Sequence, residues 1–146
     1  MLRGNQTTRI DEKGRIKIPA AFRHYIVEKY GPEMYVTSIT GECARIYPLP
    51  EWEKIEARLA ELPGMEPAKL KFLNFTNFYG QQTTMDKQGR VLIHPRLRQS
   101  AELVGEVAVL GYLTYLDVWD MERFVVRLQS EPYISEDAAA IARLGI

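Results

Sequence analysis

Two stretches of the chain, TRIDEKGRIKIPAAFR at 8–23 and TTMDKQGRVLIHPRLR at 83–98, decide the fold. Aligned at an offset of 75 residues, they share six identical residues out of 16. The identical pairs are Thr8/Thr83, Asp11/Asp86, Gly14/Gly89, Arg15/Arg90, Ile18/Ile93 and Arg23/Arg98. Further along, RIYPLPEW (45–52) matches DVWDMERF (117–124) in its apolar pattern. The chain is therefore predicted to contain two copies of one unit, at 1–75 and 76–146.

Each copy is predicted to run strand, tight turn, strand, short helix, hairpin, helix. Apolar and polar residues alternate on both sides of Asp11-Glu12-Lys13-Gly14 and of Asp86-Lys87-Gln88-Gly89, which is typical of strands. Asp favours the start of a type I turn, and Gly favours its end. Helices are expected from Pro19, from Pro50, over 67–79 and after Asp120, and a terminal helix is expected in the tail.

The size of the unit indicates how the copies combine. A unit of about 70 residues buries little apolar surface alone, so it usually needs a partner. Two such units in one chain can pack as a pseudo-symmetric pair with intertwined strands. The predicted fold class is therefore α+β, with one body made from two repeats.

Composition excludes several classes of protein. The chain has 146 residues, of which 46% are hydrophobic and 26% charged, so it is neither disordered nor of low complexity. No apolar run is long enough for a membrane span, and the N-terminus lacks a secretory signal. Cys43 is the single cysteine, so no intrachain disulfide is possible; a small buried side chain is expected, with a reactive thiol as the alternative. We expect a soluble protein of a reducing cytoplasm.

Charge alternates along the chain although its net value is zero. Residues 1–27 carry +4, residues 28–66 carry −4, residues 67–100 carry +5 and residues 101–146 carry −5. A neutral total argues against an unspecific coat on nucleic acid. The alternation instead predicts a basic face on a neutral protein.

The basic residues around the two turns are the candidate functional residues. A guanidinium can bind a phosphate or guanine with two hydrogen bonds, and Arg recurs beside both turns. The predicted DNA-binding residues are Arg3, Arg9, Lys13, Arg15, Lys87 and Arg90, and Lys17 belongs to the same basic group. Asp11, Gly14, Asp86 and Gly89 are predicted to support the motif, with each Asp orienting its arginine. The alternative is that Arg15 and Arg90 are solvated or pair only with the nearby Asp.

No constellation of residues predicts an enzyme. His24 and His94 lie outside any metal-binding or catalytic pattern, and the chain has no phosphate loop, dinucleotide fingerprint or nucleophile elbow. We therefore expect no catalysis, no cofactor, no bound metal and no small-molecule substrate. The aromatic side chains of Trp52, Trp119, Phe75 and Phe78 are predicted to lie in the core or in an interface rather than to stack on bases.

The opening MLRG, the twinned motifs DEKGR and DKQGR, the segment IYPLPEWEKIE and the late LDVWD together resemble the MraZ family of the SpoVT-AbrB superfamily. The resemblance implies two tandem swapped-hairpin units that form a pseudo-dimeric barrel with flanking helices. It implies a bacterial transcriptional regulator that binds short direct repeats upstream of its own division and cell-wall gene cluster and represses it. The D-x-x-x-R motifs, Asp11/Arg15 and Asp86/Arg90, are the DNA-binding signature of that family. Leu2 stands where the family usually has an aromatic residue.

The resemblance also implies partners and a location. They are double-stranded DNA and further copies of the chain in a ring-shaped homo-oligomer, with no membrane, in the cytoplasm at the nucleoid. The alternative is an AbrB-like antitoxin or protein-interaction module that holds a partner through its acidic segments. Two folded repeats and a short tail argue against that alternative.

Overall fold

The computed structural model describes residues 1–146 and shows an α+β fold whose main sheet is antiparallel. The six strands of this sheet lie in the order β1-β7-β8-β4-β3-β5. Their bounds are β1 Asn5–Arg9, β3 Glu33–Thr37, β4 Ala44–Pro48, β5 Gln81–Thr84, β7 Glu106–Tyr112 and β8 Tyr115–Asp120. The hairpins β3–β4 and β7–β8, predicted from the sequence, are confirmed.

Strands from the two halves of the chain pair with each other. β1 of the first half pairs with β7 of the second, and β5 of the second half pairs with β3 of the first. At the centre of the sheet, β4 pairs with β8 in a register that sets Arg45 opposite Asp117. These two residues are equivalent in the internal alignment. Equivalent residues of the two halves therefore meet at the midpoint of the sheet, with the two halves on either side of it.

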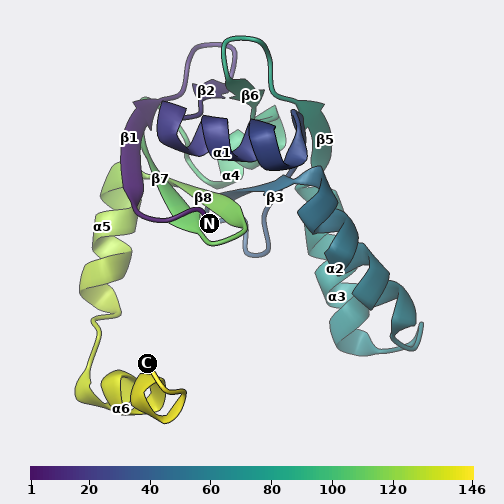
Figure 1. The fold of residues 1–146 in the computed structure, drawn as a ribbon, viewed down its shortest axis with the longest axis vertical. Coiled ribbons are helices and arrows are strands. Elements are labelled where there is room, and N and C mark those ends of the chain that lie inside the picture. Colours follow the sequence, from purple (N-terminus) through teal and green to yellow (C-terminus); the bar gives the residue numbers. More distant parts are fainter.

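A second, two-stranded ladder joins β2 (Arg15–Lys17) to β6 (Arg90–Leu92). Its register sets Ile16 opposite Val91, which are again equivalent residues of the two halves. The ladder is extended by hydrogen bonds from Ile18 N to Gly89 O and from Ile93 N to Gly14 O, both 2.8 Å. In Figure 1 the ladder and its two loops lie together at one end of the molecule.

The predicted barrel is not closed. The main sheet is open, with β1 and β5 as its edges, and β2 and β6 form a sheet of their own. The segments around each turn also form less of a hairpin than the sequence predicted: β1 and β2 are joined only by the bridge Ile10–Ile16. The physical reason is that β1 and β2 find their full pairing partners in the other half of the chain.

One hydrophobic core supports both sheets. Ile16, Ile18, Val91 and Ile93 beneath the ladder are fully buried, and they belong to the same cluster as Val36, Ile46, Val107 and Val118 of the main sheet. Phe22 and Ile26 of helix α1 (Ala20–Tyr30) and Leu97 of helix α4 (Pro95–Ser100) belong to it as well. Trp52 and Trp119 are buried, as predicted. The ladder is therefore fixed to the body of the protein by its inner side chains.

The remaining helices extend away from the ladder (Figure 1). They are α2 (Leu49–Glu61), α3 (Pro67–Phe78), α5 (Met121–Ser130) and α6 (Ser135–Arg143). As predicted, Asp120 caps α5, because its Oδ2 accepts a hydrogen bond from Arg123 N at 3.0 Å. No helix has the length and apolar character needed to cross a membrane.

Candidate nucleic-acid interface

The first turn is held together by one carboxylate. Oδ1 of Asp11 accepts hydrogen bonds from the backbone N–H groups of Lys13 (3.0 Å) and Arg15 (2.9 Å). Its Oδ2 accepts from Nε of Arg15 at 2.9 Å. Gly14 closes the turn at φ +84°, a conformation that side chains with a Cβ disfavour. The spacing D-x-x-G-R thus both forms the turn and fixes the arginine.

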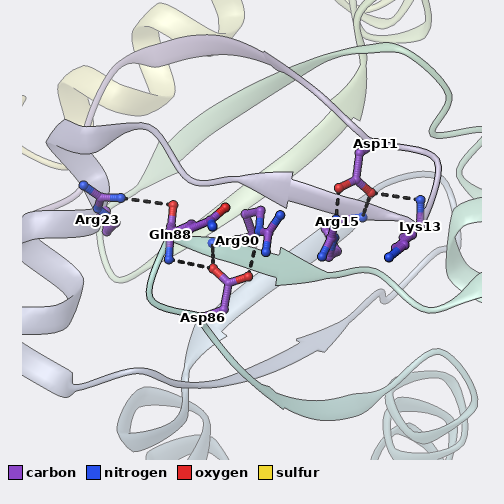
Figure 2. Close-up of polar contacts among 7 residues, drawn as sticks. All are labelled: Asp11, Lys13, Arg15, Arg23, Asp86, Gln88 and Arg90. Atoms are coloured by element: carbon purple, nitrogen blue, oxygen red, sulfur yellow. Dashed lines mark hydrogen bonds and ion pairs between the residues drawn. The ribbon is translucent and has the colours of Figure 1, made fainter.

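The second turn repeats this geometry. Asp86 accepts from the backbone N–H groups of Gln88 (2.9 Å) and Arg90 (2.8 Å) and from Nε of Arg90 (2.7 Å), and Gly89 has φ +78°. Figure 2 shows the two turns at opposite ends of the β2–β6 ladder, with an arginine held by each aspartate. The prediction that each Asp orients its Arg is consistent with these contacts in both turns.

Both aspartates are acidified by these contacts. Hydrogen bonds from the backbone of Arg15, with further ones from its side chain and from Lys13, hold the pKa of Asp11 below its usual value. The backbone N–H of Arg90 is the largest cause of the same lowering of the pKa of Asp86. At neutral pH both carboxylates are therefore ionised and able to hold an arginine.

The outward face of the ladder is cationic. Alternation along the strands turns Ile16 and Val91 inward, so Arg15, Lys17, Arg90 and Leu92 share the outer face. Lys17 and Arg90 stand directly opposite each other. Because Asp11 and Asp86 bind only the Nε atoms, the terminal Nη groups of Arg15 and Arg90 make no hydrogen bond within the chain. They are the donors available to a ligand with acceptor oxygens.

Two further arginines, Arg23 and Arg98, pack against the glycines of the two turns. Each arginine contacts the turn of the other half of the chain, and neither was predicted as a site residue. A Cβ on Gly89 would lie 2.5 Å from Cδ of Arg23, and a Cβ on Gly14 would lie 2.4 Å from Nε of Arg98. Nη1 of Arg23 donates to the Gln88 carbonyl at 3.2 Å (Figure 2). Nε of Arg98 is buried without a partner. The identity of Arg23 and Arg98 between the repeats was the signal that could have found them.

The other predicted DNA-binding residues divide into two groups. Lys13 and Lys87 are exposed in the two turns, and Arg9 is exposed at the end of β1 that leads into the first turn. Arg3 lies at the opposite end of β1, where its backbone packs against Gly111 near the β7–β8 turn. The structure thus brings four of the six predicted residues, Lys13, Arg15, Lys87 and Arg90, to the ladder and its loops, with Arg9 at the adjoining end of β1 and Arg3 apart from them.

A hollow of about 570 Å³ adjoins the second turn. It is lined by Asp86 and Lys87 together with residues of α1 and its C-terminal loop, among them Arg23, His24 and Glu28. His24, for which a surface or packing role was expected, is exposed there. Arg23 and Lys87 in its lining are balanced by Asp86 and Glu28, so the hollow adjoins the cationic face of the ladder without adding net charge to it.

Elsewhere the chain shows no cluster of three or more His, Cys, Asp or Glu side chains able to hold a metal ion. Cys43 is buried, as expected, and burial raises the pKa of its thiol to about 12. Nε2–H of His94 donates a hydrogen bond to the Tyr79 carbonyl at 2.6 Å.

The chain is an α+β protein of two intertwined halves, and each half presents one D-x-x-G-R turn on a shared basic ladder. Comparison with known proteins identifies its family. The family model described as "MraZ protein, putative antitoxin-like" matches residues 1–75 and 79–144. The chain is 49% identical to "Transcriptional regulator MraZ" of Acidobacterium capsulatum over the whole of both chains, and 49% identical to that of Koribacter versatilis, again over their full lengths. A relative of the same name from Acidithiobacillus ferrooxidans is 37% identical over 85% of each chain. The chain belongs to the MraZ family.

Proposed function

We propose that this chain is a sequence-specific DNA-binding transcriptional regulator that reads DNA with its β2–β6 ladder. The observation that carries the proposal is the pair of arginines whose Nε atoms are bound to aspartate while their Nη groups stay free. A preoriented guanidinium whose two Nη groups are free matches guanine O6 and N7 or a phosphate. The relatives' name, transcriptional regulator, supports the same function.

The division of labour within the interface follows from geometry. Arg15 and Arg90, held by their aspartates, are suited to base edges, which demand a fixed direction. Lys13, Lys17, Lys87 and Arg9 are point charges or flexible groups suited to phosphates, which position a protein without specifying sequence. Arg3, at the far end of β1, would reach only a flanking part of the duplex. Gly14 and Gly89 keep the turns closed, so that each Asp stays in reach of its Arg.

The two ends of the ladder differ in chemistry. Equivalent positions carry Glu12 and Lys87, Lys13 and Gln88, and Lys17 and Leu92. A symmetric ladder would favour a palindromic site, whereas this one has a direction. That direction supports recognition of short direct repeats, which point the same way along the DNA.

The biological role completes the proposal. We infer that the chain represses its own division and cell-wall gene cluster from direct repeats upstream, in the cytoplasm at the nucleoid. We interpret the interleaved strands as two tandem swapped-hairpin units, about 1–75 and 76–146, and expect copies of the chain to gather as a ring-shaped homo-oligomer. Such a ring would bring several ladders to several repeats.

A mobility-shift assay on the protein's own upstream region tests the proposal. Arg15→Ala and Arg90→Ala should each weaken binding, by about 1–3 kcal/mol with relaxed specificity for a base contact, or equally on all sequences for a phosphate contact. Their thermal melts should stay close to wild type, because each arginine is partly exposed and a partly exposed ion pair contributes about 0–1 kcal/mol. Arg58→Ala on α2 removes the same charge far from the ladder and should bind normally. Wild-type binding by both ladder variants would refute the interface.

A further inference from the structure

The C-terminal helix α6 has no partner within its own chain. Every residue from 131 to 146 is exposed. Figure 1 shows α6 beyond the end of α5 and separated from the rest of the molecule. It has nine residues, and an isolated helix of that length is marginal in water. A helix at this position therefore needs a surface to pack on.

One face of α6 is apolar. Ile134, Ala138, Ile141 and Leu144 recur at spacings of four, three and three residues, which places them along one stripe. Leu144 is 74% exposed. The other residues of the segment 131–146 make it acidic, because Glu131, Glu136 and Asp137 outnumber Arg143.

A complementary surface lies on α3. Phe75 and Phe78, which the sequence analysis placed in the core or an interface, are 47% and 54% exposed. Together with Asn74 and Tyr79 they line an apolar groove of about 290 Å³. Helix α3 carries Lys69 and Lys71 and no acidic residue. Arg96 lies at the groove, with its guanidinium 4.4 Å from the centre of the Phe78 ring and Nη1 donating to the Phe78 carbonyl.

We propose that α6 of one chain docks with its apolar stripe in the Phe75–Phe78 groove of a second copy of the chain. The acidic segment 131–146 is complementary in charge to Lys69 and Lys71 of α3, and an apolar helix face laid in an aromatic groove is a common mode of helix binding. In Figure 1 α6 and α3 lie on opposite sides of the molecule, so α6 does not reach the groove on α3 of its own chain. Each copy instead offers one helix and one groove, a head-to-tail contact that builds a ring when its rotation closes.

This inference rests on the proposed self-assembly and names the contact between copies; it does not depend on DNA recognition.

Cross-linking tests the contact. Phe75→Cys and Ile141→Cys are made in separate full-length chains, and the two are mixed under mild oxidation. Native Cys43 stays unreactive, because it is buried with a pKa of about 12. We expect a disulfide-linked pair of chains from this mixture. Ala139→Cys, on the opposite side of α6, should give at least tenfold less product with Phe75→Cys.

Light scattering without DNA provides the second measurement. Ile141→Asp should reduce the assembly to single chains at a concentration where Ala139→Asp, the matched control, stays assembled, with both melting like wild type. Phe75→Glu should act like Ile141→Asp, and Asn77→Glu on another face of α3 should not. Equal cross-linking by the two cysteine positions of α6, or an Ile141→Asp variant as large as wild type, would overturn the proposal. Failure of DNA recognition would appear elsewhere, in the mobility shifts of wild type and the Arg15→Ala and Arg90→Ala variants.

Discussion

The two oxygens of the Asp11 carboxylate bind different parts of the first turn. Oδ1 receives two backbone N–H groups and stabilises the turn, whereas Oδ2 receives Nε and directs the Arg15 side chain. Asp86 does the same for the second turn. At the residue scale, loss of an aspartate therefore affects both the fold and the proposed interface, and loss of an arginine affects mainly the interface.

The aspartates give a pH dependence of known sign. The folded-state pKa of Asp11 lies below the usual 3.8, so its ionised form stabilises the fold above that pH, and this stabilisation is lost as the pH falls through the lower folded value. Asp11→Asn should therefore melt at a lower temperature than wild type near neutral pH. The difference should begin to shrink below about pH 4 and disappear below the lowered folded pKa, where the wild-type carboxylate also loses its charge.

Thermal melts across this pH range check the prediction, with Glu12→Gln as the control. Glu12 is the neighbouring acid, and its carboxylate accepts no hydrogen bond. Its removal should leave the pH profile unchanged. Asp11→Asn should also weaken DNA binding, because the direction of Arg15 is no longer fixed. A difference in melting temperature that persists unchanged at acid pH would show that the charge of Asp11 contributes nothing.

At the scale of elements, the β2–β6 ladder contains one unfavourable pair of like charges. Lys17 and Arg90 face each other directly on its exposed side, and like charges in such a pair are unfavourable by about 0.2–1 kcal/mol. The equivalent position in the second half carries Leu92, so a cation is not needed there to form the strand. A polyanion lying on the ladder would remove the repulsion.

Lys17→Leu, which copies the residue of the second half, tests this account. Without DNA the variant should be more stable by up to about 1 kcal/mol at low salt, with the gain fading as salt screens the pair. Its DNA affinity should fall on all sequences, with a salt slope shallower by about 1, because one phosphate contact is lost. Urea unfolding and anisotropy titrations at several salt concentrations measure both effects. A variant with unchanged stability and an unchanged salt slope would contradict the proposed role.

Local patterns predicted the elements well and their partners poorly. The helices after Pro19, Pro50 and Asp120, the hairpin of each half and the terminal helix follow from local turn, cap and periodicity signals. The pairing of β1 with β7 and of β2 with β6 joins residues far apart in sequence, and periodicity contains no information on such pairs. The predicted barrel is wrong for the same reason, since closure depends on which edges meet.

The candidate site shows the same limit. Asp11, Arg15, Asp86 and Arg90 were identified because their contacts lie within four residues along the chain. Arg23 was missed, because it acts on a glycine of the other half, and only the fold brings the two together. Whether the predicted residues bind DNA stays a prediction.

At the scale of the whole molecule, charge is separated along its length. The basic ladder lies at one end, and helices α2 and α6, which both carry net negative charge, extend toward the other (Figure 1). A neutral chain can thus approach DNA with a cationic end while its acidic helices point away from the phosphates. One ladder alone offers few contacts, so a single chain should bind weakly.

We therefore expect affinity to depend on assembly. Joining several weak ladders raises the effective concentration of each, provided that their spacing fits the DNA. Binding should need several repeats at a suitable spacing and should fall steeply with salt. Titrations of DNA that varies in repeat number and spacing at fixed salt, with the oligomer followed by light scattering, measure this. Full affinity for one isolated repeat, or a single chain that binds as tightly as the assembly, would leave simple one-ladder recognition as the explanation.

The ion pair at the middle of the main sheet makes the two halves non-interchangeable. Nε of Arg45 donates to Asp117 at 2.9 Å, and burial raises the pKa of the Asp117 carboxyl while the guanidinium opposes that rise. A chimera built from two copies of the first half would set Arg against Arg at this point, and one built from two second halves would set Asp against Asp. An uncompensated buried charge costs about 3–5 kcal/mol. A chain rebuilt from two equal halves would therefore lose stability at this point, so each half is matched to the other by this one pair.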